Sequence, residues 1–165
     1  MSKRRILVPF KKRTHDHAEC IDSALVSAQS SCERQGLRLT KLRRRILELV
    51  WRGHTPVKAY DLLEELRKED RAAAPPTVYR ALDFLLNAGL VHRIESLSAF
   101  VGCGGPATPH FGQFLICREC SAVAEIDAPA IARALVADAE ALGFHADRQT
   151  IEIKGLCADC SGLDP

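Results

Sequence analysis

The sequence predicts an α+β protein with an N-terminal winged helix-turn-helix domain and a small C-terminal α+β domain. Three observations indicate this fold. Amphipathic helical patterns fill most of residues 17–87, two short strand patterns follow them directly, and three further strand patterns surround an alanine-rich helix near the C-terminus. There is no apolar run of the roughly 18–20 residues that a membrane-spanning helix needs, which excludes a spanning protein.

Charge is divided unevenly along the chain. Residues 1–100 hold 19 basic and 12 acidic side chains, and residues 101–165 hold 4 basic and 9 acidic ones, so nucleic-acid contact is expected only in the first half. Residues 1–13 carry Lys3, Arg4, Arg5, Lys11, Lys12 and Arg13 and no acid. We expect residues 1–17 to be a flexible arm; an arm lying along the phosphate backbone is the alternative. Their apolar run, residues 6–10, is too short for a secretory signal, which predicts a cytoplasmic protein.

The first two helices are expected over residues 17–35 and 41–52. Gly36 and Gly53 are suitable stops, and Thr40 is a candidate N-cap because its side-chain oxygen can accept a first-turn N–H. The polar face of the second helix has one sign of charge, carried by Lys41, Arg43, Arg44 and Arg45. Such a run is usually a solvated face, but its single sign favours contact with phosphate.

The third and fourth helices precede a hairpin. The third covers residues 59–68, and the fourth runs from about residue 77 to residue 87, since Pro75 and Pro76 are tolerated only where a helix begins. Strand patterns follow over residues 91–95 and 99–102. In winged-helix modules the helix before the hairpin enters the major groove of DNA. The fourth helix leaves on its outer side Thr77, Tyr79, Arg80 and Asp83, and we expect Tyr79 and Arg80 to read bases.

The remaining sequence predicts a linker and a second domain. Residues 103–110 are rich in glycine and proline, and they separate a domain over residues 18–102 from one over residues 111–165. In the second domain, strands are expected over residues 113–116, 123–126 and 149–153, with a helix over residues 129–142. A domain of about 50 residues is small enough to need a covalent or metal staple.

Four cysteines supply such a staple. Cys117 with Cys120, and Cys157 with Cys160, form two C-x-x-C pairs 36 residues apart. Four thiolates on two tight turns are typical of structural zinc, which binds four soft ligands tetrahedrally. Two redox-active dithiols are the less favoured alternative, because neither pair opens a helix after a βαβ-type strand.

The other candidate ligands cannot be joined by spacing alone. Cys20 and Cys32 are interpreted as small core residues, His110 as a loop histidine, and Glu125 as a solvated strand position. Cys103 stands out because it ends the hairpin in a glycine-rich loop. The sequence contains no convincing nucleotide-binding loop and no nucleophile elbow, so no enzymatic activity and no small-molecule substrate are predicted.

Several motifs together resemble the ferric uptake regulator superfamily, and within it the zinc uptake regulator branch. They are A-Y-D-L-L at residues 59–63, P-P-T-V-Y-R-A-L-D-F-L at residues 75–85, G-L-V-H-R-I-E-S at residues 89–96, and the paired C-x-x-C motifs. The resemblance covers about residues 18–160. It implies a homodimeric, zinc-responsive repressor that binds palindromic operator DNA and represses zinc uptake genes, with residues 103–110 as a hinge and the C-terminal domain for dimerisation.

The resemblance also implies two zinc ions per protomer. The structural zinc is carried over to the four paired cysteines, and the regulatory zinc to His92, Cys103, His110 and Glu125. For DNA, the resemblance implies base contacts by Tyr60 and Arg80 and a backbone contact by Tyr79. We expect Thr77 to lie at the same interface, and Lys41, Arg43 and Arg44 to contact phosphates. An iron-, manganese- or peroxide-sensing member of the superfamily is the near alternative, and an architectural protein with two structural metal sites is the distant one.

Overall fold

A computed structural model describes residues 5–10, 17–53, 55–108 and 110–162. The chain divides into two compact units: a helical unit of residues 11–107, and a sheet unit of residues 1–10 and 108–165. The division between residues 107 and 108 falls inside the expected linker. None of the helices in the described ranges is long and apolar enough to cross a membrane.

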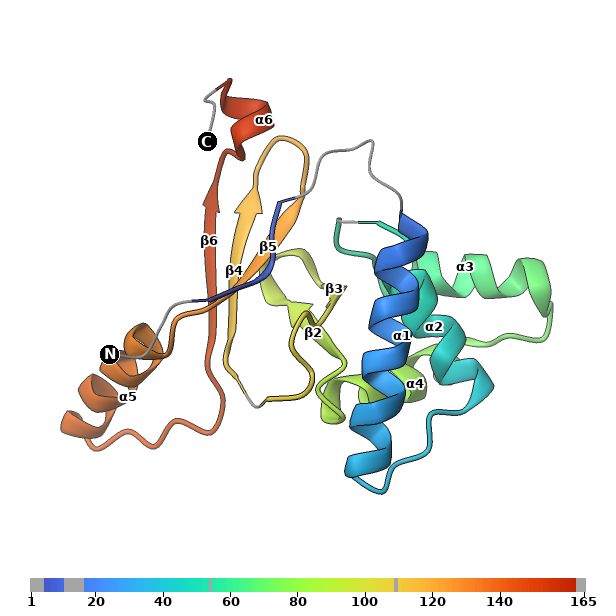
Figure 1. Cartoon of the computed structure of the whole chain (residues 1–165), viewed down its shortest axis with the longest axis horizontal. Helices are drawn as coiled ribbons and strands as arrows, with labels where there is room; N and C mark the ends of the chain where they lie inside the picture. The colour runs from blue at the N-terminus through green and yellow to red at the C-terminus, as the bar shows by residue number, and fades with distance from the viewer. Residues whose placement is uncertain (1–4, 11–16, 54, 109, 163–165) are drawn as a thin grey trace. The chain divides into compact units, whose positions relative to one another are not determined.

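The helical unit has the element order of a winged helix-turn-helix (Figure 1). Its elements are α1 (His17–Arg34), α2 (Lys41–Trp51), α3 (Ala59–Glu69), α4 (Pro75–Asn87), β2 (Val91–Ile94) and β3 (Ala99–Gly102). All six were predicted, with bounds within about two residues. Helix α4 starts at Pro75 because proline lacks only an N–H that the first turn leaves unpaired in any case.

Local sequence determines how these elements begin and meet. Thr40 is the N-cap of α2, as expected, and its side chain accepts a hydrogen bond from the backbone N–H of Arg43. The apolar stripes of the four helices converge on a core in which Ile46, Leu62 and Leu85 are fully buried. At about 1.5–3 kcal/mol for each large side chain, this burial is the main stabilising contribution to the unit.

The sheet unit is built on four strands. They are β1 (Arg5–Val8), β4 (Gly112–Cys117), β5 (Val123–Asp127) and β6 (Thr150–Gly155), in the order β1-β5-β4-β6. Strand β5 is antiparallel to both β4 and β1, and β6 is parallel to β4. Helix α5 (Pro129–Ala141) supplies the long connection that a parallel pair requires, and the short α6 (Ala158–Ser161) follows β6.

The expectation of a flexible N-terminal arm is wrong for residues 5–8, which form β1. The edge of β5 offers unpaired backbone N–H and C=O groups, and the apolar sequence Ile6-Leu7-Val8 suits a strand. Arg5 is anchored by an ion pair with Asp127. The other basic residues of the expected arm, Lys3, Arg4, Lys11, Lys12 and Arg13, lie outside the described residues.

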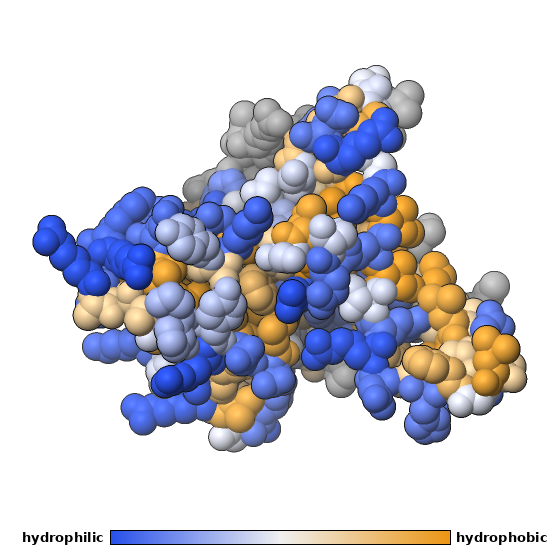
Figure 2. Space-filling view, turned by 180° about the vertical axis from the view of Figure 1, so that it is seen from behind, coloured by the Kyte–Doolittle hydropathy of each residue, from blue (hydrophilic) through white to orange (hydrophobic). Residues whose placement is uncertain are grey.

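The sheet unit exposes apolar side chains. Those on and after α5 and β6 are Ile131, Leu135, Leu142, Phe144, Ile153 and Leu156. Part of this surface, over α5, is visible as orange atoms at the lower right of Figure 2. Apolar surface gathered in this way over α5 is typical of an interaction face.

Candidate metal centres and nucleic-acid interface

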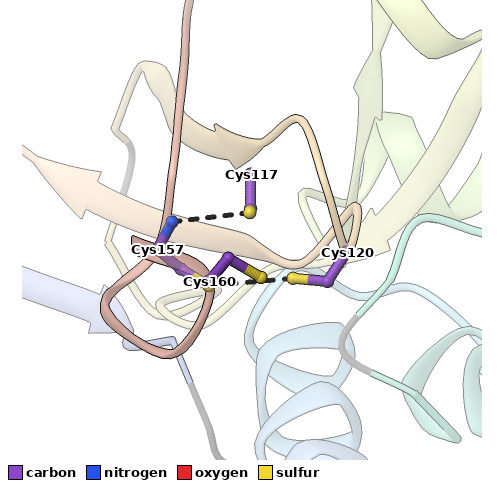
Figure 3. Close-up of side chains that lie close together, drawn as sticks. All are labelled: Cys117, Cys120, Cys157 and Cys160. Atoms are coloured by element: carbon purple, nitrogen blue, oxygen red, sulfur yellow. Dashed lines mark hydrogen bonds between the residues drawn. The ribbon is translucent and has the colours of Figure 1, made fainter. Parts of the chain in front are cut away.

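The four paired cysteines lie together in the sheet unit (Figure 3). Cys117 ends β4 and begins a tight turn in which its carbonyl oxygen accepts the N–H of Ser121, a residue with a positive φ of 59°. In the second pair, Cys157 is the N-cap of α6 and Cys160 lies within that helix, where its N–H bonds to the carbonyl of Cys157 at 3.1 Å. All four sulfur atoms lie within 4.8 Å of one another.

The sulfur geometry fits a metal better than a disulfide. The sulfurs of Cys120 and Cys157 are 3.7 Å apart, and all seven cysteines of the chain are free thiols. A tetrahedral zinc ion with bonds of about 2.3 Å to sulfur places its ligands about 3.8 Å apart, whereas a disulfide requires about 2.05 Å. The arrangement therefore suits four thiolates around one ion.

Hydrogen bonds and burial shift the pKa values of three cysteines in this cluster. Backbone N–H groups of Cys120 and Cys157 lower the pKa of Cys117 to about 6, and the second of them lies 3.4 Å from its sulfur. Hydrogen bonds with the sulfurs of Cys157 and Cys120 raise the pKa of Cys160 to about 12. At Cys157 the N–H of Cys160 lowers the pKa, but burial and neighbouring sulfurs outweigh it, and the net pKa is raised. The Cys117 thiolate is thus available at neutral pH, and a metal must displace the protons of Cys157 and Cys160.

A second pair of candidate ligands lies in the sheet unit. Glu125 is in β5 and only 2% exposed, so its interpretation as a solvated strand position is wrong. Its carboxylate oxygen Oε1 lies 2.7 Å from Nε2 of His110, and Nδ1 of His110 lies 2.9 Å from the carbonyl oxygen of Thr108. A carbonyl oxygen only accepts, so Nδ1 carries a proton.

This arrangement leaves the other histidine nitrogen facing an acceptor. With Nδ1 protonated, neutral His110 presents the lone pair of Nε2 to the carboxylate of Glu125, and two acceptors 2.7 Å apart repel unless a proton or a cation lies between them. A histidine that donates through one nitrogen to a carbonyl and offers the other to a cation is the usual form of a metal ligand. The pair therefore fits a metal site.

A third pair of ligands lies in the helical unit, at the hairpin. His92 is in β2, where it pairs with Val101 of β3, and Cys103 directly follows β3. The N–H of Cys103 donates to the carbonyl of Leu90 at 3.0 Å, which extends the ladder and fixes the cysteine. The ligand atoms of His92 and Cys103 lie within 4.8 Å of each other. Each unit thus contains two of the four residues that the family resemblance implies as ligands of the regulatory zinc.

The expected DNA-reading surface is exposed. Tyr79, Arg80 and Asp83 are exposed on α4, Thr77 is half-buried, and Tyr60 is exposed on α3. On α2, Lys41 and Arg44 are exposed.

Two arginines of α2 are also held within the helical unit. The guanidinium of Arg43 lies 3.5 Å from the ring centroid of Phe84 in α4 and donates to the carbonyl of Arg38. Arg45 forms ion pairs with Glu48 and Glu69. These contacts tie α2 to its neighbours, and Arg44 forms an ion pair with Glu48 of the same helix at 3.5 Å.

The two cysteines outside these sets lie on α1. Cys32 is buried, as predicted, and burial raises the pKa of its thiol, while Cys20 is only half-buried. Sequence reasoning missed β1 and the burial of Glu125. The apolar run at residues 6–8 was a usable signal for β1; no local signal indicated that Glu125 is buried.

Fold and sites together define a winged-helix protein with metal-binding side chains in both units. Residues 34–154 match the sequence profile described as "Ferric uptake regulator family", and the chain belongs to this family. Its members are transcription regulators rather than enzymes.

Comparison with individual relatives points to one branch. The chain is 40% identical to the zinc uptake regulation protein of Escherichia coli K12 over 137 residues, which cover 82% of this chain and 80% of that protein. It is 30% identical to the protein of the same name from Mycobacterium tuberculosis H37Rv over 128 residues, covering 76% and 95%.

Among solved structures, "Zinc Uptake Regulator Complexed With Zinc and DNA" matches with 38% identity and a TM-score of 0.82, covering 87% of this chain and 96% of that one. "Crystal structure of holo XcZur" matches with 44% identity and a TM-score of 0.80, covering 86% and 99%.

Proposed function

We propose that the protein is a zinc-responsive transcriptional repressor that binds operator DNA as a homodimer and represses genes for zinc uptake. The similarity to zinc uptake regulators, one of them solved with zinc and DNA, supports this function. The observation that carries it is the buried His110–Glu125 pair, in which Nε2 lies 2.7 Å from the carboxylate while Nδ1 faces a carbonyl oxygen, so that a proton or a cation must lie between the two side chains. Such a pair is suited to reversible binding of a cation.

Two zinc ions per protomer follow from the ligand chemistry. The four paired cysteines would hold a structural zinc, with all ligands in one unit. A regulatory zinc would take its ligands from both units: His92 and Cys103 from one, His110 and Glu125 from the other. Neither unit alone supplies more than two of these four regulatory ligands, fewer than the three or four protein ligands that zinc normally takes. A thiolate with two imidazoles favours zinc over Fe²⁺ or Mn²⁺, which prefer harder ligands.

The regulatory ion, when bound, would act as a cross-link and leave the chemistry of DNA recognition to the protein. Binding that needs ligands from both units restricts the hinge at residues 103–110. In a dimer this restriction sets the spacing between the two α4 helices, which must match major grooves about 34 Å apart or a multiple of that distance. Zinc and DNA affinities are then reciprocally coupled.

Dimerisation and DNA contact use different surfaces of the chain. The exposed apolar side chains of α5 and β6 in the sheet unit are suited to a homodimer interface. Arg80 on α4 can make a bidentate contact with O6 and N7 of guanine, and Tyr60 on α3 and Tyr79 on α4 are exposed aromatic side chains. Lys41 and Arg44 supply phosphate contacts that weaken as salt is raised.

The proposal is tested with Cys103→Ser, compared with Cys20→Ser as a matched control on α1. DNA fragments are first selected by the zinc-loaded protein from a random pool. DNA binding is then measured against free zinc, iron and manganese after mild chelation. We expect Cys103→Ser to remain a folded dimer with one zinc per chain and to lose zinc-dependent binding, while Cys20→Ser behaves like the wild type. Unchanged binding by Cys103→Ser, or DNA binding that ignores zinc, contradicts the proposal.

A further inference from the structure

The N-terminal strand β1 lies against the strand that carries Glu125 (Figure 1). Without β1, β5 would be an edge strand of the sheet. With β1 present, Glu125 has a partner on each side, Phe114 of β4 and Val8 of β1. Because edge strands fray and central strands do not, β1 restricts the backbone at this residue.

The pairing is irregular beside Glu125. Ile6 pairs with Ile126 and Val8 pairs with Glu125, so Leu7 is an extra residue on β1 and forms a β-bulge. A bulge bends its strand, increases the local twist and can re-aim a side chain, and bulges are frequent next to functional sites. Here the irregularity lies directly opposite the candidate metal ligand.

A charge contact anchors the same strand. The guanidinium of Arg5 donates to Oδ2 of Asp127 through Nε at 3.2 Å and Nη2 at 2.7 Å. Asp127 is two residues beyond Glu125 on β5, so the two carboxylates point to the same face of the sheet. Asp127 is largely buried, and Arg5 compensates its charge. The ion pair therefore holds β1 against β5. It also compensates the charge of the Asp127 carboxylate, which lies beside Glu125.

We propose that β1 is a positioning element for Glu125, and that its docking raises the zinc affinity of the regulatory site. The ordering of a ligand before the metal arrives removes part of the entropy cost of binding. By linkage, zinc at Glu125 must stabilise the docked strand by the same factor. The inference rests on the proposed function, because it takes His110 and Glu125 as zinc ligands.

The docked strand also changes how the chain joins its two units. β1 belongs to the sheet unit, whereas α1, the next element, belongs to the helical unit. The chain therefore connects the units twice, once through the linker at residues 103–110 and once between β1 and α1.

The test uses charge reversal in the full-length protein. Arg5→Asp places two acids together, Asp127→Arg places two arginines together, and the double variant restores an ion pair with opposite polarity. Arg148→Asp, at an exposed position of the same unit, is the matched control for net charge. Zinc affinity of the second site is measured by chelator competition with the cysteine site already loaded, together with the visible spectrum of Co²⁺ at the second site.

We expect Arg5→Asp to weaken the second zinc about tenfold, within the usual range of coupling between sites, and to alter the Co²⁺ spectrum. The double variant should recover most of the affinity, Arg148→Asp should match the wild type, and each variant should keep the first zinc. Amide hydrogen exchange in β1 should slow when the second zinc binds the wild type, and should not slow in Cys103→Ser.

The possible failures are distinguishable. If Glu125→Ala removes the second zinc while Arg5→Asp leaves its affinity and spectrum unchanged, the positioning role is wrong and the proposed function stands. The positioning role is also wrong if zinc leaves hydrogen exchange in β1 unchanged. If the wild type binds one zinc only, or Glu125→Ala binds two with normal affinity, the assignment of the regulatory site fails, and the inference falls with it.

Discussion

Replacing Gly102 with alanine tests the contact between the hairpin and α2. Gly102 is the last residue of β3 and directly precedes Cys103, and a Cβ atom added to it would lie no more than 2.5 Å from three atoms of the Trp51 indole. An ordinary contact at this position requires about 3.4 Å or more and the nearest indole atom would lie at 2.1 Å, so the ring or the strand must move by more than an ångström. Overpacking of this kind typically costs about 1–3 kcal/mol.

This cost should be visible as a loss of thermal stability. For a unit of roughly 100 residues, 1 kcal/mol lowers the melting temperature by about 4–8 °C, so Gly102→Ala should lower it by several degrees at least. Trp51 is the only tryptophan of the chain, and its fluorescence reports how the strain is relieved. A red shift means that the indole turns out toward water, whereas unchanged emission with weaker zinc binding at Cys103 means that β3 has moved instead.

Two further variants make the test specific. Gly155→Ala is the control, because no atom lies within 4 Å of the Cβ it would add, and it should leave stability nearly unchanged. Gly102→Ala combined with Trp51→Leu should cost less than the sum of the two single changes, since the smaller side chain makes room for the methyl group. The reasoning is refuted if Gly102→Ala melts like the wild type with the same emission and the same zinc affinity.

Three other outcomes follow from the described side chains. At the cysteine cluster, zinc must displace at least the two protons that the raised pKa values of Cys157 and Cys160 retain, so the logarithm of the apparent zinc affinity should rise by two or more per pH unit between pH 6.5 and 8; chelator competition that gives a slope clearly below two contradicts this. Cys117→Ser should lose one zinc per chain and the cooperative unfolding of the sheet unit, measured by metal content and circular dichroism; full zinc content with normal melting overturns the structural assignment. Arg80→Ala should cost about 1–3 kcal/mol on selected DNA and little on random DNA in fluorescence anisotropy, and an equal loss on both would make it a phosphate contact.

The helical unit was predictable because its signals are local. Apolar residues at helical spacing, the N-cap Thr40 and the prolines at 75 and 76 each act within one or two turns of chain. The order of helices and hairpin then indicated the winged helix before any long-range contact was known. The cysteine cluster was equally predictable, because each C-x-x-C motif is itself a local turn.

The sheet unit was less predictable because its decisive contacts are distant in sequence. Arg5 meets Asp127 across 122 residues, and nothing near residues 5–8 indicates that an open sheet edge exists to receive them. Glu125 is buried because β1 and β4 flank its strand and because His110 lies against it. Alternation along β5 alone favours a solvated side chain at that position, so only the tertiary structure or a family resemblance can identify it as a ligand.

The distribution of ligands gives a physical reason for the proposed roles of the two metal sites. All four paired cysteines lie in the sheet unit on tight turns, so a zinc ion there binds without restricting one unit against the other. His92 and Cys103 belong to the helical unit, whereas His110 and Glu125 belong to the sheet unit. A zinc ion shared by these pairs must offset the entropy lost when the hinge is restricted, which makes its affinity lower and dependent on the arrangement of the units. DNA that selects the same arrangement must then raise that zinc affinity, so the zinc concentration for half-saturation should fall when operator DNA is added, and only at this site.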